Sequence, residues 1–412
     1  MVAGLSDFQP KDSAGLIGPP KKAISVLHVV ENLNNQAVES WLLRVLAAAV
    51  EEYPHVHWTF FCVLGKTGRL DEVAHALGAE VIHSRYELGD KLHFLSSLRK
   101  VMKQGRYDIL HCHHDIMSAP YLLASVGLPI RKRIVHIHNT SVSLPTPSRT
   151  KAGLAREPMR QVCLRMADQI VGISSEALQS LIGNRQQDPK RHTVVHYAVD
   201  TARFAQARLD VTAFRESLGI SPAAKILLFV GRIVEYKNPC FVVEILKHLV
   251  EMHSNVVAVF AGIGNRESDL REMAQREALE ARVTLLGFRE DVPELMLASD
   301  VLIWPSLEEP KEGLGLGIVE AQVAGLPILM SCSVPQEAIV VPGLVKVLPL
   351  RAGAQAWADA VIEILKRPQL RRDESRTKVE SSSFSMEAGV GNIMALYESV
   401  GSRSSEPGAL HK

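Results

Sequence analysis

Two glutamates, Glu312 and Glu320, enclose a glycine-rich stretch within the segment PKEGLGLGIVEAQVAGLPIL (residues 310–329). The segment follows an apolar run that indicates a buried strand, and a helix is expected from it to about Ala324. Free N–H groups and the positive end of the dipole make a helix start a good site for phosphate. The two carboxylates then suit separate roles, one at a sugar hydroxyl and the other at a ribose diol. The plain alternative is a glycine-rich turn with two surface glutamates.

Two cations, Arg232 and Lys237, follow a second buried strand (residues 225–231). Asn238 is expected to cap the next helix, with Pro239 at its first position. An Arg and a Lys on one strand-end loop suit a diphosphate, because the guanidinium binds bidentately and the ammonium is a mobile point charge. Fixed cations also lower the barrier when negative charge builds on a leaving diphosphate. Two solvated loop cations are the alternative.

Two histidine pairs, His111 with His113 and His136 with His138, have the i, i+2 spacing that places side chains on one face of a strand. Strand-end polar residues in an α/β protein commonly bind substrate, and a histidine can donate a hydrogen bond to a hydroxyl. Zinc ligation by the two pairs is the rival hypothesis. It is disfavoured, since no cysteine or carboxylate pattern completes such a site.

The chain that positions these residues alternates short apolar runs with amphipathic helical stretches, a pattern typical of parallel sheets with crossover helices. The predicted strands of a first block are residues 24–30, 56–64, 80–84, 108–113, 133–138, 169–174 and 192–197. Those of a second block are residues 225–231, 256–262, 282–288, 300–306, 327–331 and 344–350. The sequence therefore predicts an α/β protein whose ligands bind at the carboxyl ends of strands, in a cleft between two domains.

The domain boundaries follow from this alternation. We expect a flexible tail at residues 1–22, a first Rossmann-like domain at 23–200 and a second at 201–385. Residues 386–412 are expected to form a terminal helix that crosses back to the first domain and then a second flexible tail.

Composition narrows the class of protein. The 412 residues are 47% hydrophobic and 22% charged, and the sequence holds neither a bilayer-spanning apolar run nor a compact signal peptide. We therefore expect a cytoplasmic protein. The net charge of +1 gives no reason to expect nucleic acid. Residues 85–165, however, hold fourteen Lys or Arg against five Asp or Glu. Solvated helix faces explain this excess, or else a basic surface that meets an anionic acceptor or the inner face of a membrane.

Longer stretches of the second block carry a specific resemblance. VGRIVEYKN, FAGIGNRESDLREMA, RVTLLGFREDVPELMLASDVLIWPSLEE and EGLGLGIVEAQVAGLPIL, in this order, resemble glycosyltransferase family 4, the large group of retaining GT-B enzymes. In the first block VLHVVENLNNQAVESWLLRVLAAAV, YDILHCH, RIVHIHNTS and ADQIVGISSEAL resemble family segments more weakly. The resemblance implies a GT-B fold, with two Rossmann-like domains and a central cleft.

The donor site follows from the resemblance. It implies that Arg232 and Lys237 hold the diphosphate of a nucleotide sugar, that Glu312 touches the sugar and that Glu320 binds the ribose hydroxyls. Main-chain amides are expected around sugar and phosphate along Gly313, Leu314, Gly315, Leu316 and Gly317.

Two further positions are carried over from the family. Arg289, in the loop that begins at Gly287, corresponds to a contact near the nucleotide base, and His138 to a first-domain histidine near the transferred sugar. The expected catalytic set is therefore Glu312, Arg232, Lys237 and His138. Neither a metal ion nor another cofactor is expected, because the cations and the helix dipole do a metal's work.

The chain also departs from the family pattern. Gln36 and Ala37 stand where paired glycines commonly precede the first-domain helix, in a loop that closes on the donor. Tyr197 and Ala198 replace an Asn-Gly pair. The missing glycines put close approach of the backbone to phosphate in doubt.

The resulting expectation is a retaining glycosyltransferase. It would move a hexose-type unit from a nucleoside diphosphate sugar, UDP-linked by family frequency, to a polysaccharide or glycolipid precursor. Peripheral contact with an anionic membrane surface is part of this hypothesis. Two alternatives stay open: a nucleotide-sugar epimerase or hydrolase on the same fold, and a non-catalytic nucleotide-sugar-binding protein.

Overall fold

A computed structural model describes residues 22–34, 37–140, 149–206, 209–252, 255–367 and 370–400 of the chain, and the side chains of 149–154 and 206 are not described. Apart from Lys22, the first predicted tail lies outside these ranges, and so do residues 401–412 at the other end. Gln36 also lies outside them. Two compact units emerge. The N-terminal unit comprises the described residues up to Ala198 together with those from Met386 onward, and the C-terminal unit runs from Val199 to Ser385.

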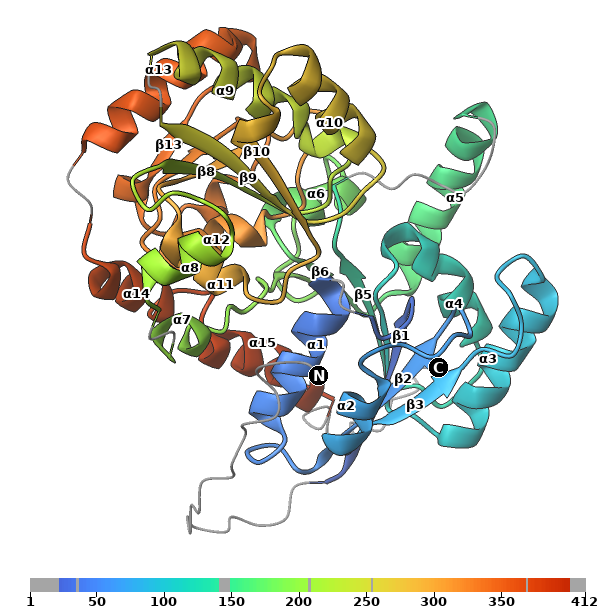
Figure 1. Ribbon diagram of the computed structural model, residues 1–412. Coiled ribbons are helices and arrows are strands. Elements are labelled where there is room, and N and C mark those ends of the chain that lie inside the picture. Colours follow the sequence, from blue (N-terminus) through green and yellow to red (C-terminus); the bar gives the residue numbers. More distant parts are fainter. Residues whose placement is uncertain are drawn as a thin grey trace, which may run out of the picture. The chain divides into compact units, whose positions relative to one another are not determined.

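The sheet of the N-terminal unit has seven parallel strands in the order β3-β2-β1-β4-β5-β6-β7. The strands are β1 Ile24–Val30, β2 Val56–Cys62, β3 Glu80–His83, β4 Ile109–Cys112, β5 Lys132–Ile137, β6 Gln169–Gly172 and β7 His192–Val194. The central strands are almost fully buried because helices cover both faces, as the continuous apolar runs predict (Figure 1). All seven predicted strands are confirmed, each within three residues at either end.

The helices of this unit are α1 Ala37–Ala49, α2 Asp71–Ala76, α3 Lys91–Gly105, α4 Ala119–Ala124, α5 Arg149–Met166, α6 Ser175–Ile182 and α15 Met386–Glu398. Local capping explains individual helix starts. The hydroxyl of Ser174, for example, accepts a hydrogen bond from the Ala177 N–H at 3.0 Å ahead of α6. The last of these helices, α15, comes from the far end of the sequence and packs beside α1 (Figure 1).

The C-terminal unit has a six-stranded parallel sheet in the order β10-β9-β8-β11-β12-β13. The strands are β8 Lys225–Val230, β9 Val256–Ala261, β10 Val283–Gly287, β11 Val301–Trp304, β12 Ile328–Met330 and β13 Val345–Val347. The helices are α7 Ala202–Gln206, α8 Val211–Ser217, α9 Cys240–Met252, α10 Glu267–Arg276, α11 Val292–Ala298, α12 Leu316–Val323, α13 Gly353–Lys366 and α14 Arg372–Glu380. Apolar side chains of β8, β9, α9 and α13 form one core around Phe229, Phe260 and Trp357.

Both sheets share one topology. In each, the chain starts at a central strand, moves outward to one edge and returns to continue on the other side, which is the doubly wound arrangement. The predicted α/β class with two Rossmann-like units is confirmed. None of the helices described here is both long and apolar enough to pass through a bilayer.

Candidate functional site

A buried ion pair occupies the carboxyl edge of the C-terminal sheet. The ammonium of Lys237, at the end of a short 3₁₀ turn after β8, lies 2.5 Å from Oε1 of Glu312 in the loop between β11 and α12. Strands β8 and β11 are neighbours, so their carboxyl ends bring together two residues that are 75 positions apart. Both side chains are buried, which makes the attraction far stronger than that of a surface pair.

Three donors converge on the same oxygen of Glu312. Oε1 accepts hydrogen bonds from the Lys237 ammonium, from the indole N–H of Trp304 at 3.2 Å and from the hydroxyl of Ser306 at 2.5 Å. The Trp304 ring also lies under the ammonium, 4.4 Å from its centroid, where its π face attracts the cation. Trp304 and Ser306 end the predicted strand IWPS, and our sequence reasoning assigned them no role. The three donors thus fix the Glu312 carboxylate through its Oε1 atom.

The glycine-rich segment takes the predicted strand–loop–helix form. Gly315 precedes the first residue of α12 with a φ of 81°, a left-handed conformation that favours glycine. Gly317 lies inside the helix instead of ahead of it. A Cβ there would come within 2.9 Å of the Trp304 ring, so the packing of the helix against this ring requires a small residue. Glu320 lies one turn into the helix.

The remaining residues predicted to surround the donor are divided between the loop and the helix. Gly313 and Leu314 form the loop ahead of α12, and Leu316 is its first residue. Leu314 is buried, so this position offers a ligand main-chain groups and not its side chain. The start of α12 therefore presents backbone N–H groups next to the buried ion pair.

Arg232 leaves the end of β8 and is exposed, unlike Lys237. Its guanidinium hydrogen-bonds the Tyr236 hydroxyl at 2.5 Å. The predicted helix start after this loop was wrong by one residue: α9 begins at Cys240, and Asn238 has a φ of 51° instead of the extended conformation of a cap. Asparagine tolerates this left-handed conformation, which lets the chain turn before the helix.

Arg289 lies just beyond β10, two strands away from β8 in the sheet. Two of its guanidinium nitrogens contact the carboxylate of Asp291, at 2.7 and 2.5 Å, and these bonds raise the pKa of the guanidinium above its usual value. The structure therefore joins Lys237 to Glu312 directly but gives Arg289 a carboxylate partner of its own.

Two glycines that we did not single out fix the shape of this edge. A Cβ on Gly262 would lie 1.9 Å from the carbonyl oxygen of Gly231, and one on Gly264 would lie 2.0 Å from that of Ile233. The loops after β8 and β9 can therefore approach each other only because neither glycine has a side chain. The FAGIGN stretch carried this signal in its two glycines.

In the N-terminal unit, His138 is held at three atoms. Its main-chain N–H donates to the Asp115 carboxylate at 2.6 Å, its Nδ1 lies 2.6 Å from the Tyr197 hydroxyl, and its Nε2 lies 3.1 Å from Nδ1 of His113. Burial lowers the pKa of His138 well below the ordinary value of histidine, so the ring is neutral at pH 7. Both ring nitrogens thus have partners inside the unit, and the predicted ring contact with a sugar hydroxyl would have to displace one of them.

Asp115 was not predicted and combines two unusual properties. It has a φ of 49° in a non-glycine residue, and its second oxygen accepts a hydrogen bond from the Asn139 side chain at 2.8 Å. Burial raises the pKa of Asp115 to about 6. A strained, buried carboxylate that holds the chain after β5 is typical of a functional edge.

The histidine pairs of the sequence gather into one buried cluster with a fifth member, His28. The groups His28, His111, His113 and His113, His136, His138 each place three ring nitrogens within 4.8 Å of one another. The rings of His136 and His138 are stacked with centroids 4.4 Å apart, and those of His111 and His113 are tilted by 33° with centroids 4.1 Å apart. Ring nitrogens from neighbouring strands lie 3.1 to 3.2 Å apart in pairs, which is hydrogen-bond distance, so hydrogen bonding describes this geometry better than metal ligation.

Comparisons with known proteins agree with both halves of this description. The family model described as Glycosyltransferase Family 4 matches residues 26–203, and the one described as Glycosyl transferases group 1 matches residues 210–379. EpsF of Bacillus subtilis (strain 168) is 26% identical over 90% of this chain and 96% of its own length. The UDP-Gal:alpha-D-GlcNAc-diphosphoundecaprenol alpha-1,3-galactosyltransferase of Escherichia coli is 28% identical over 64% of this chain and 68% of its own.

Among solved structures, HepE of Anabaena in complex with UDP superimposes with a TM-score of 0.72 at 18% identity, covering 92% of this chain and all of HepE. At this identity the likeness concerns the fold alone. The two family models meet near residue 205 and together span both sheets, and the predicted resemblance is confirmed. The chain therefore belongs to glycosyltransferase family 4 and is a glycosyltransferase with the GT-B fold.

Proposed function

We propose that this glycosyltransferase moves a hexose-type unit from a UDP-sugar to a saccharide or lipid-linked saccharide, with retention at the anomeric carbon. Support for the donor comes from HepE, which was crystallised with UDP, and from the E. coli relative, whose name gives UDP-Gal as donor. The same name includes a diphosphoundecaprenol-linked sugar, which supports an acceptor attached to a lipid.

The observation that carries the proposal is the one-sided bonding of Glu312. All three of its donors reach Oε1, and no described residue hydrogen-bonds Oε2. This second oxygen is suited to accept a hydrogen bond from a sugar hydroxyl. An ammonium has three N–H donors, so Lys237 can bind a phosphate oxygen while it keeps Glu312 in place. We propose that sugar and diphosphate meet at this pair, beside the start of α12.

The residues around the pair suit the chemistry of transfer. In the proposed step the acceptor oxygen bonds to the anomeric carbon, and the bond from that carbon to the β-phosphate oxygen breaks. The acceptor proton passes to the leaving phosphate on the same face of the sugar. Arg232 and Lys237 stabilise the charge that builds on the diphosphate, and the α12 dipole adds to this effect. Arg289 and Glu320 are proposed to contact base and ribose.

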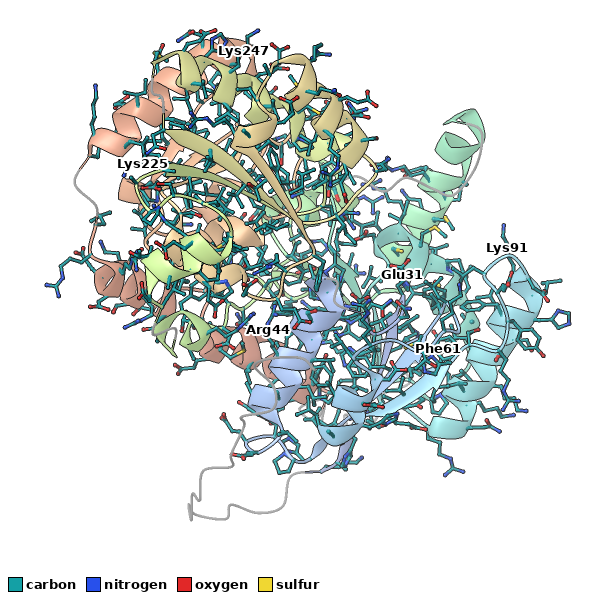
Figure 2. All side chains as sticks on the ribbon, in the orientation of Figure 1. Glu31, Arg44, Phe61, Lys91, Lys225 and Lys247 are labelled. Atoms are coloured by element: carbon teal, nitrogen blue, oxygen red, sulfur yellow. The ribbon has the colours of Figure 1, made fainter. Side chains whose placement is uncertain are left out.

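The N-terminal unit, which we propose binds the acceptor, has a surface that suits a membrane. Around the start of α3, the side chains of Tyr86, Leu88 and Leu92 are exposed, Leu92 by 83%. Lys91 points away from the ribbon beside them (Figure 2), and Lys100 lies exposed further along the helix. Apolar side chains interspersed with lysines match an anionic lipid surface, where the former enter the headgroup region and the latter meet phosphate. We propose that this surface holds the enzyme at its lipid-linked acceptor.

Vesicle sedimentation tests the membrane contact. The protein should sediment with vesicles of phosphatidylglycerol and not with vesicles of phosphatidylcholine, and Leu92→Glu should abolish the difference. Met252→Glu changes an apolar side chain of the C-terminal unit that is also exposed, by 44%, and should have no effect. Equal sedimentation of both variants, or none by the wild type, would contradict the membrane contact alone.

Thermal unfolding in the presence of nucleotides tests the donor. A ligand that binds only the folded protein raises its Tm, so UDP and UDP-sugars should shift the transition while GDP and ADP do not. We propose that neither binding nor transfer requires a metal ion, so the shift should persist in EDTA. Release of UDP only when an acceptor is present would identify a transferase. Release of free sugar without an acceptor would indicate a hydrolase, and binding without any release would indicate a non-catalytic protein.

A further inference from the structure

Five buried histidines lie on one face of the N-terminal sheet. His28 comes from β1, His111 and His113 from β4 and the residue after it, and His136 and His138 from β5 and the residue after it. These three strands are neighbours, and the Cα of His28 is directly opposite that of His111. The register therefore places the rings in two adjoining rows, and none of the five is more than 6% exposed.

The first row is connected by hydrogen bonds from Tyr197 to His28. The Tyr197 hydroxyl lies 2.6 Å from Nδ1 of His138, and Nε2 of that ring lies 3.1 Å from Nδ1 of His113. Nε2 of His113 in turn lies 3.1 Å from Nδ1 of His28. Both links between rings join the Nε2 atom of one histidine to the Nδ1 atom of the next.

The second row continues the same chain through Tyr397 of α15. Nε2 of His28 lies 3.4 Å from the Tyr397 hydroxyl, which lies 2.9 Å from Nδ1 of His111. Nε2 of His111 lies 3.2 Å from Nδ1 of His136, and Nε2 of His136 has no partner among the described residues. Seven side chains thus form one path with the same orientation at every link.

This uniform orientation restricts where the protons are. A neutral imidazole carries one N–H and one acceptor nitrogen, so a ring that donates through Nε2 must accept through Nδ1. The Tyr397 hydroxyl accepts from one of its two histidines and donates to the other, since these are its described partners. Every link is then satisfied only when all five rings carry the proton on Nε2, or all five carry it on Nδ1. Burial lowers the pKa of His28 and His136 to about 3, which keeps the rings neutral and the rule valid at pH 7.

We propose that Tyr197 and Tyr397 are positioning residues, whose hydroxyls join the five histidines into one chain that fixes the ring of His138. Through His138 this hydrogen-bonded chain holds the end of β5, and under the proposed function we expect His138 near the transferred sugar, as the family resemblance implies. The inference rests on that proposed function for its catalytic consequence, but not for the shared tautomer.

Nitrogen-15 NMR of the full chain labelled at histidine tests the tautomers directly, because protonated and bare ring nitrogens have well separated shifts. Single His→Gln variants assign the signals. The five buried rings should share one tautomer in the wild type. Tyr397→Phe removes the link between the rows and should give His111 and His136 a mixture of tautomers. Unlike tautomers in the wild type would overturn the proposal, whether or not the protein transfers sugar.

Transfer kinetics test the catalytic consequence. Tyr197→Phe should lower kcat/KM by about tenfold, mainly through kcat, because a mobile His138 misplaces the sugar without removing its binding groups. Tyr107→Phe is the matched control, because this buried tyrosine of the same unit hydrogen-bonds Thr59 and takes no part in the chain of histidines. This variant should leave kcat and the tautomers unchanged. Equal kinetics of both variants would overturn the positioning role. A wild type that binds no nucleotide would instead refute the proposed function.

Measurement of bound zinc tests whether the histidines form a metal site instead. After equilibration with Zn²⁺ and exhaustive dialysis, the protein should retain none at the histidines. Stoichiometric zinc that is lost in His113→Gln would identify a metal site and overturn the proposal.

Discussion

The two units hold their polar side chains by opposite means. In the C-terminal unit a charged pair, Lys237 and Glu312, is fixed by donors that all reach one carboxylate oxygen, which leaves the other oxygen for a ligand. In the N-terminal unit five neutral rings bond to one another and to two tyrosines, and both nitrogens of His138 have partners. Among the described residues the first arrangement therefore has one carboxylate oxygen without a hydrogen bond, and the second has one such ring nitrogen, Nε2 of His136.

The two regions should therefore respond differently to mutation and to pH. In the proposed function the charges of Lys237 and Glu312 act on a ligand, so their loss should appear in turnover. The neutral chain acts on protein structure, so its loss should appear in stability and in its dependence on pH. Four predictions follow this division, ordered by the size of the expected effect.

The largest effect is expected from Glu312→Gln. The amide keeps the size of the side chain but loses the charge that orients Lys237, and we expect kcat/KM to fall by roughly 10²- to 10³-fold. Steady-state release of UDP measures the loss. Glu308→Gln changes an exposed carboxylate of the same loop and should leave activity intact. A variant that loses its circular dichroism instead of its activity would show that the pair serves the fold.

Acid should weaken the N-terminal unit selectively. Its buried histidines have pKa values below that of an unfolded histidine, so stability is complete above pH 6.5 and falls with pH from there toward 3. Each imidazole contributes about 1.4 kcal/mol per pH unit. Asp115 and Glu39, with pKa values raised to about 6 and 7, act in the opposite direction, but they are fewer.

Hydrogen exchange in urea at pH 7.5, 6 and 5 measures this loss for each unit separately. His136→Gln should reduce the pH slope of the N-terminal unit by about one imidazole, while His57→Gln, at an exposed position, should not. If the stability of the two units depended equally on pH, the predicted difference between them would be contradicted.

Glycine substitutions should have opposite signs in the two units. Gly317→Ala puts a methyl group against the Trp304 ring in α12 and should cost about 1–3 kcal/mol. Gly391→Ala in α15 meets nothing within 4 Å and should stabilise its unit by up to about 1 kcal/mol. Denaturant unfolding of both variants gives the comparison, and a destabilised Gly391→Ala would contradict it.

The smallest effect is expected from Arg289→Ala. Its partly exposed bond to Asp291 is worth no more than about 1 kcal/mol of stability. If the guanidinium also contacts the base, the Kd for UDP should rise by about tenfold. Calorimetric titration with UDP measures it. An unchanged Kd would leave Arg289 with its structural partner alone.

Most of the fold could be predicted because buried parallel strands carry continuous apolar runs. The runs at 24–30 and 225–231 match β1 and β8 nearly to the residue. Local chemistry was less reliable. Asn238 is a residue type that commonly caps helices, yet it has a φ of 51° and ends the short 3₁₀ turn ahead of α9 instead.

The candidate site could be predicted only where a motif lies within one segment. The glycine-rich loop and its two glutamates were visible, whereas Trp304 and Ser306 acquire a role only because the loop folds back onto the strand that precedes it. His28 and Tyr397 are 369 residues apart, and no spacing rule connects them. Such contacts depend on strand order and register, which the sequence pattern leaves open.

The return of α15 also has a consequence for the order in which the protein is made. The N-terminal unit is synthesised first, but its histidine chain is joined only when Tyr397 has been made, after the whole of the C-terminal unit. The C-terminal unit is a continuous stretch of chain with no such wait. Although domains commonly complete folding from the N-terminus onward, here the later-made unit has all its parts before the earlier one does.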